Sequence, residues 1–125
     1  MAVGLSTAVA NSQLNVFRGT AMSGVPVYVK LHVGDPGAAG TSNPSAVTTR
    51  NQATFNAPSG GSMTLASLAS YSMTATETIS HISLWDAASA GNFLASAALS
   101  SAKSVVSGDT VTLTSLTVSK SNLAA

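Results

Sequence analysis

The chain has 125 residues, of which only 7% are charged, and its formal net charge is +1. A chain of this length can form one domain with its own core, and a hydrophobic fraction of 45% excludes a disordered tail. So few charges give almost no colloidal repulsion, and alanine, serine and threonine are abundant. The composition therefore predicts a subunit that packs against copies of itself or against another protein.

Composition also excludes several classes of partner. The five basic residues are spread from Arg18 to Lys120 and do not form the cluster that binding to nucleic-acid phosphates requires. No apolar run approaches the roughly 20 residues of a membrane-spanning helix, so we expect no membrane partner. With no cysteine, the chain has no disulfides and no thiolate metal ligands.

The first predicted element is a helix over residues 6–18. Ser6 can cap its N-terminus, and Gly19 can end it directly after Arg18, whose charge suits the negative end of a helix. An approximate apolar stripe along the segment consists of Leu5, Val9, Leu14, Val16 and Phe17.

Residues 25–119 show the period of two that is typical of strands. The clearest strand covers residues 25–33, where valine and leucine alternate with larger or polar residues, and a turn follows at residues 34–37. Further strands are predicted at residues 48–55, 62–68, 71–75, 78–85, 93–99 and 111–118. A change of parity near Ser115 predicts a bulge or bend in the last of these.

Short strands at this spacing, rich in Thr and Val, predict a mainly β fold: an antiparallel β-sandwich or small barrel with one N-terminal helix. We expect a single domain over residues 1–125, with the helix at 6–18 and the sandwich at 25–119.

No arrangement of residues in the sequence indicates an enzyme. Asp35 and Asp109 stand beside glycines in turn segments, where carboxylates cap backbone N–H groups. His32 and His81 can meet across a sheet, but no further histidine and no cysteine completes a zinc site. We therefore predict no catalytic residue, no cofactor and no metal, and we give a small hydrolase using the two histidines little weight.

Five residues are candidates for an interface. Trp85 and Tyr28 occupy the outward parity of their strands, and Trp and Tyr concentrate binding energy at protein contacts. The alternative is that both faces of the sheet are covered, with the helix lying over one of them. The candidate interface residues are Phe17, Arg18, Tyr28, His81 and Trp85.

Seven segments, in order along nearly the whole chain, carry a resemblance to a known family. They are Leu5–Asn11, Phe17–Ala21, Val27–Thr41, Arg50–Gln52, Ser59–Gly61, His81–Ala87 and Val106–Thr110. Together they resemble a family of small virion structural proteins of tailed actinobacteriophages. The chain departs from the common pattern at Val33, where threonine is frequent, and in a short polar stretch at residues 45–49.

The resemblance implies a virion protein without catalytic residues. Our first hypothesis is a capsid decoration or minor capsid protein on the head surface. It would bind the major capsid protein as a homo-oligomer, of which a trimer is one form. The alternative is a minor tail or tail-fibre component that contacts other tail proteins. In that case Trp85, Tyr28 and the loop at residues 38–46 would form an exposed face for a host receptor or surface glycan.

Overall fold

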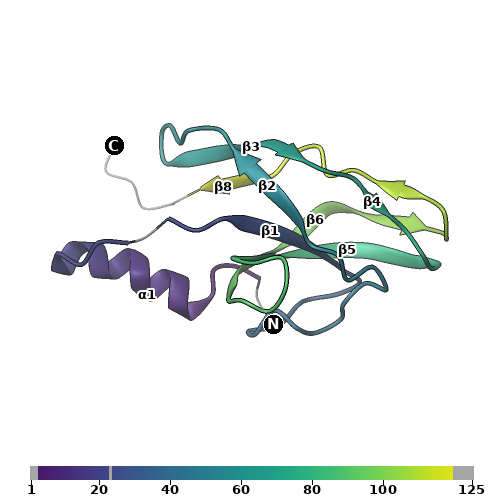
Figure 1. Cartoon of the computed structure of the whole chain (residues 1–125), viewed down its shortest axis with the longest axis horizontal. Helices are drawn as coiled ribbons and strands as arrows, with labels where there is room; N and C mark the ends of the chain where they lie inside the picture. Colours follow the sequence, from purple (N-terminus) through teal and green to yellow (C-terminus); the bar gives the residue numbers. More distant parts are fainter. Residues whose placement is uncertain (1–2, 23, 120–125) are drawn as a thin grey trace.

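The computed structural model describes residues 3–22 and 24–119, and it is built from one helix and two antiparallel sheets (Figure 1). The larger sheet has six strands in the order β6-β5-β1-β2-β3-β8, and the smaller pairs β4 with β7. The strands are β1 Val27–His32, β2 Asn51–Phe55, β3 Ser62–Leu68, β4 Tyr71–Ser72, β5 Glu77–Trp85, β6 Phe93–Val105, β7 Thr110–Val111 and β8 Thr117–Ser119. The predicted mainly β class with one N-terminal helix is confirmed.

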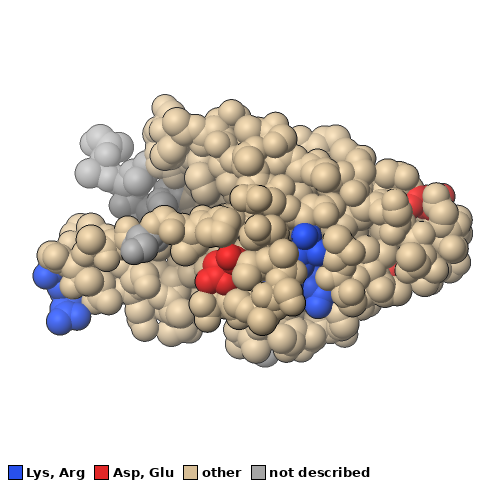
Figure 2. Space-filling model, viewed as in Figure 1, with Lys and Arg blue, Asp and Glu red and all other residues tan. Residues whose placement is uncertain are grey.

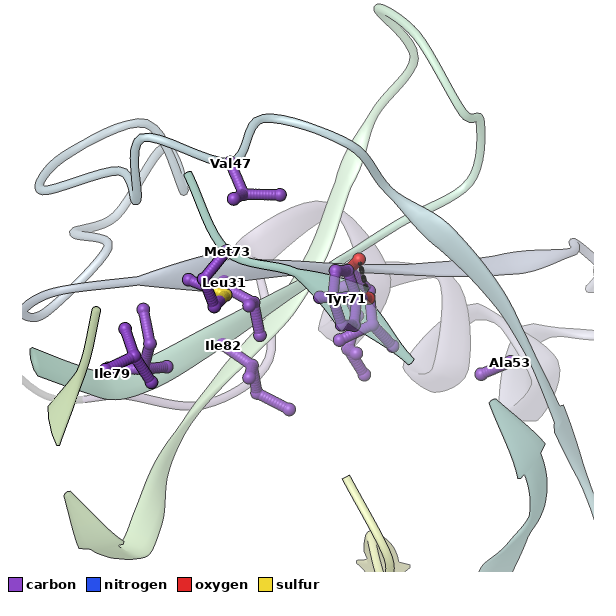
Figure 3. Packing of buried hydrophobic residues seen from close by; sticks show 10 residues of the cluster. Leu31, Val47, Ala53, Tyr71, Met73, Ile79 and Ile82 are labelled. Atoms are coloured by element: carbon purple, nitrogen blue, oxygen red, sulfur yellow. Dashed lines mark hydrogen bonds between the residues drawn. The ribbon is translucent and has the colours of Figure 1, made fainter. Parts of the chain in front are cut away.

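The core lies between the curled six-stranded sheet and the β4–β7 pair. Val29 and Leu31 of β1 are 0% and 2% exposed, as their alternation predicted, and Ile82 of β5 lies beside them. Tyr71 and Met73 cover this group from the other layer (Figure 3). Because Tyr71 donates its hydroxyl hydrogen to the backbone oxygen of Val29, its polar end is satisfied inside the core.

The parity change near Ser115, which predicted a bulge or bend, lies where the chain passes between the two sheets. Strand β7 pairs with β4 in the small sheet, whereas β8 pairs with β3 in the large one. The residues between them are not in a strand, and the chain crosses there from one sheet to the other. When a chain passes from one sheet to the other, the alternate set of side chains points into the core that the two sheets share.

The long strand β6 is irregular in its second half. Ile79 of β5 faces Lys103, but His81, two residues further along β5, faces Ala98. Five residues of β6 therefore correspond to two of β5, and the chain bulges between positions 98 and 103. The predicted strand at residues 93–99 covers the first half of β6, which contains a smaller register shift where Leu84 faces Ala95 and Trp85 faces Phe93.

The helix predicted over residues 6–18 consists of α1, Thr7–Asn15, followed by one 3-10 turn at Val16–Arg18. The Ser6 hydroxyl accepts a hydrogen bond from the amide of Val9, and Gly19 ends the segment with a φ of 82°. Contrary to the alternative considered above, α1 does not cover a sheet face, since none of its residues is buried. It extends along the long axis of the molecule, beyond the strands at one end (Figure 1).

Candidate functional site

Two loops, and not the helix, cover part of the face of the large sheet opposite the core, which we call the outer face. Residues 34–46 return beside the end of β1, where His32 pairs with Pro44. Pro36, Gly40 and Ser45 in this loop are buried. Within the loop at residues 38–46, Gly40 and Ser45 anchor the chain on the sheet, and the other seven residues are exposed.

A buried hydrogen-bonded chain beneath these loops joins three side chains of β1 and β5. His32 Nδ1 lies 2.8 Å from the carbonyl oxygen of Ser42, and a carbonyl can only accept, so Nδ1 carries the proton. His32 Nε2 then accepts from the Ser83 hydroxyl at 2.7 Å, and Ser83 Oγ accepts from Trp85 Nε1 at 2.7 Å. Every donor in this chain of bonds has one acceptor.

The hydrogen bond between His32 and Ser83 resembles that between a general base and a serine nucleophile, but a substrate could not reach it. Both residues are 0% exposed, and the serine oxygen already accepts a hydrogen bond from the indole. Its role is therefore to satisfy polar groups beneath the loops.

The stability of the protein should fall as the pH drops below about 6.5. Burial lowers the pKa of His32 below its usual 6.5, with further lowering by Lys30 and His81 that the backbone carbonyls of Ser42 and Asn43 partly oppose. The unfolded chain therefore binds a proton more readily than the folded chain, which loses stability between pH 6.5 and the folded pKa. Melting temperatures between pH 8 and pH 5 test this, and His32→Gln should flatten the dependence. A wild-type melting temperature that does not change over this range would contradict it.

Trp85 is 6% exposed, so it does not serve as a free aromatic anchor on this surface. Its ring packs against Phe93 with 5.6 Å between centroids, and the Arg50 guanidinium lies 4.0 Å from its ring centre. Arg50 Nη1 also donates to the carbonyl oxygens of Ala87 and Ala90, at 3.1 and 2.7 Å. Arg50 thereby holds the loop between β5 and β6 over the indole.

Tyr28 and His81 lie near this cluster and are half-buried. Tyr28 is directly opposite Trp85, and His81 is directly opposite His32, as the sequence allowed. Among the described residues no group of three His, Cys, Asp or Glu side chains could hold a metal ion. The two histidines instead make separate contacts, since His81 Nδ1 lies 2.8 Å from the Ser80 hydroxyl.

The other two candidate residues, Phe17 and Arg18, lie in a segment before β1 that we call the N-terminal arm (residues 3–22, 24 and 25). The arm joins the sheet at the free edge of β6, where Leu5 pairs with Ala95 and the Ser6 amide donates to the Leu94 carbonyl. Beyond this attachment, Arg18 donates to the Asn15 side chain at 3.0 Å.

The surface of the arm is strongly apolar. Phe17 is 90% exposed and Leu14 is 63% exposed, and together with Val16 and Met22 they line a groove of about 490 Å³. Seven of the nine large hydrophobic residues that are exposed in the described chain belong to this arm; they are Val3, Leu5, Leu14, Val16, Phe17, Met22 and Val25. Such a concentration of exposed apolar side chains marks a contact surface.

A family model described as Podophage GP4 fiber I protein gp80 matches residues 4–120. The chain belongs to this family. It is therefore a structural protein of a bacteriophage virion, which bears out the virion assignment of the resemblance but not its restriction to actinobacteriophages. No curated protein matches the chain. No helix in the described parts is long and apolar enough to cross a membrane.

Sequence reasoning placed all five candidates in one set, whereas in this gp80-family protein they form two. Phe17 and Arg18 lie on the arm, and Tyr28, His81 and Trp85 lie at the outer face. The contribution of Arg50 was not recognised, because its partner Trp85 is 35 residues away and no local pattern connects them. The opposition of strands β1 and β2, which brings Arg50 beside the outer-face residues, is a tertiary feature.

Proposed function

We propose that the protein is a subunit of a phage tail fibre and that its N-terminal arm is the surface through which copies of the chain assemble. The observation that carries this proposal is the cluster of exposed apolar side chains on the arm, headed by Phe17. Membership of a family described by a fibre protein supports a place on the tail rather than decoration of the head.

A second copy of the chain is the partner that fits the arm best. Arg18 is the only charged residue among the described positions of the arm, so two identical arms can meet with little electrostatic repulsion. Burial of one phenylalanine side chain contributes about 1.5–3 kcal/mol, and several apolar residues share this surface. Contacts of this kind repeated along a fibre give a stable assembly from modest single affinities.

Replacing Phe17 with serine should dissociate the assembly without unfolding the subunit. At 90% exposure Phe17 adds almost nothing to the fold, so the melting temperature should stay within a few degrees of the wild-type value. The measurement is molar mass by light scattering coupled to gel filtration. The matched control is Val106→Ser, because Val106 is 51% exposed but lies in the turn between β6 and β7, away from the arm.

Two outcomes contradict the proposal. If Phe17→Ser keeps the wild-type molar mass, or the wild-type protein is a monomer at high concentration, the arm does not mediate self-association. Antibody labelling of virions in the electron microscope tests the location separately. Gold particles on the tail support the fibre assignment, and gold particles over the head would favour the decoration hypothesis.

A further inference from the structure

The antiparallel register places two positive charges opposite each other at the outer face. Val29 of β1 faces Asn51 of β2, and extending this register by one position brings Lys30 opposite Arg50, the residue before β2. Like charges directly opposite each other on neighbouring strands destabilise a sheet. Burial, and after it the charge of Arg50, lower the pKa of Lys30. The repulsion between Lys30 and Arg50 is therefore unfavourable for the sheet.

The structural role of Arg50 does not account for Lys30. The hydrogen bonds of Arg50 Nη1 to the loop carbonyls, and its place on the Trp85 ring, explain why an arginine occupies position 50. A neutral side chain at position 30 would permit the same contacts without repulsion. In a chain with five basic residues, a pair of them opposite each other indicates a surface that binds negative charge.

The surroundings of the pair match a sugar better than a simple ion. Two residues before Lys30 on the same face, Tyr28 stands opposite Gln52. The Tyr28 ring is half-buried, and the Gln52 side chain is exposed. An aromatic ring can pack against the C–H face of a pyranose, an amide can bond its hydroxyls, and the cations can pair with a carboxylate.

The Asp86 carboxylate is held mainly by Asn92 and not by the basic pair. The carboxylate of Asp86 accepts hydrogen bonds from the backbone amide and side chain of Asn92, at 2.6 and 2.9 Å. These bonds are the main reason that the pKa of Asp86 is lowered, and Arg50 contributes least. Basic atoms gather at the centre of the face shown in Figure 2, with acidic atoms beside them.

We propose that the outer face around Tyr28, Lys30, Arg50 and Gln52 binds a carboxylate-bearing saccharide, such as a uronic-acid polymer of a bacterial surface. This inference rests on the proposed fibre function, in which a saccharide site on each subunit would be repeated many times. Repetition allows a weak single site to hold a cell surface.

The test is a titration of the purified protein with oligogalacturonate. Binding is monitored through the fluorescence of the sole tryptophan, Trp85, because the Arg50 guanidinium lies over its ring. Neutral dextran, inorganic phosphate and a DNA duplex are titrated in parallel. Lys30→Gln should weaken binding of oligogalacturonate about tenfold, the equivalent of one charge-assisted hydrogen bond. The matched control is Lys103→Gln, which changes the net charge equally at an exposed position of β6 and should bind like wild type.

Binding of oligogalacturonate that is lost in Lys30→Gln and kept in Lys103→Gln supports the site. Absence of binding, or equal loss in both variants, overturns it, because equal loss means only a response to net charge. Phosphate or DNA binding as tightly as the oligosaccharide overturns the saccharide class. Antibody labelling of the tail does not depend on this titration, so failure of the saccharide site and failure of the fibre assignment give separate results.

Discussion

Replacing Gly40 with alanine is expected to destabilise the protein by about 2–4 kcal/mol. Gly40 has a φ of 74°, in the left-handed region, where a side chain costs roughly 1 kcal/mol. A Cβ at this position would lie 2.3 Å from Cδ1 of Phe93, so the ring must move. Displacing a packed ring costs roughly another 1–3 kcal/mol and disturbs its contact with Trp85.

Gly60→Ala is the control for the Gly40 variant. Gly60 also has a positive φ, 59°, but a Cβ there would meet nothing within 4 Å. The control therefore carries the backbone strain without the clash, and we expect it to cost no more than about 1 kcal/mol. Urea unfolding of both variants gives the comparison. Equal losses of stability would mean that the loop at residues 34–46 does not press on Phe93.

The sequence predicted the elements whose signals are local. Alternation identified β1 and its buried Val29 and Leu31, and the serine and glycine at either end of the helical segment marked its limits. The glycine beside Asp109 indicated the turn before β7. Each of these signals operates within a few residues, where backbone preferences and one covered face suffice to decide the structure.

The covering of the outer face could not be predicted in the same way. Trp85 is buried because Arg50, Phe93 and the loop after β5 meet over it, and these contacts join segments that no period or spacing connects. The helix shows the converse: its sequence carries an approximate apolar stripe, and Leu14 and Phe17 of that stripe are exposed in the single chain. A periodic apolar stripe indicates that one face of a helix packs against another surface, but it does not show whether that surface belongs to the same chain.

The same difference between local signals and tertiary contacts applies to the candidate interface and binding residues. Phe17 and Arg18 were named from the sequence alone, and both are exposed in the structure. The opposition of Lys30 and Arg50 depends on the pairing of β1 with β2, which the sequence did not specify. A strand register shifted by one residue would turn one of these two side chains to the core face.

Replacing Ser83 with alanine is expected to cost about 2–4 kcal/mol, although it removes a single oxygen atom. That oxygen accepts from Trp85 Nε1 and its hydrogen is donated to His32 Nε2, so the variant leaves two buried polar atoms without partners. Each unsatisfied buried group costs about 1–3 kcal/mol. The single tryptophan reports the change directly, and its emission should shift when its indole loses the hydrogen bond.

Ser67→Ala provides the comparison, because Ser67 also exchanges a short hydroxyl bond, 2.6 Å to Thr54, but on the exposed surface. Water replaces a lost partner there, so the loss of stability should stay below about 0.5 kcal/mol. Urea unfolding of the two variants therefore compares the same chemical change inside and outside the fold. A Ser83→Ala protein as stable as Ser67→Ala would show that the hydrogen-bonded chain does not hold the loops on the sheet. Because protonation of His32 acts on the same chain of bonds, Ser83→Ala should also alter the loss of stability below pH 6.5.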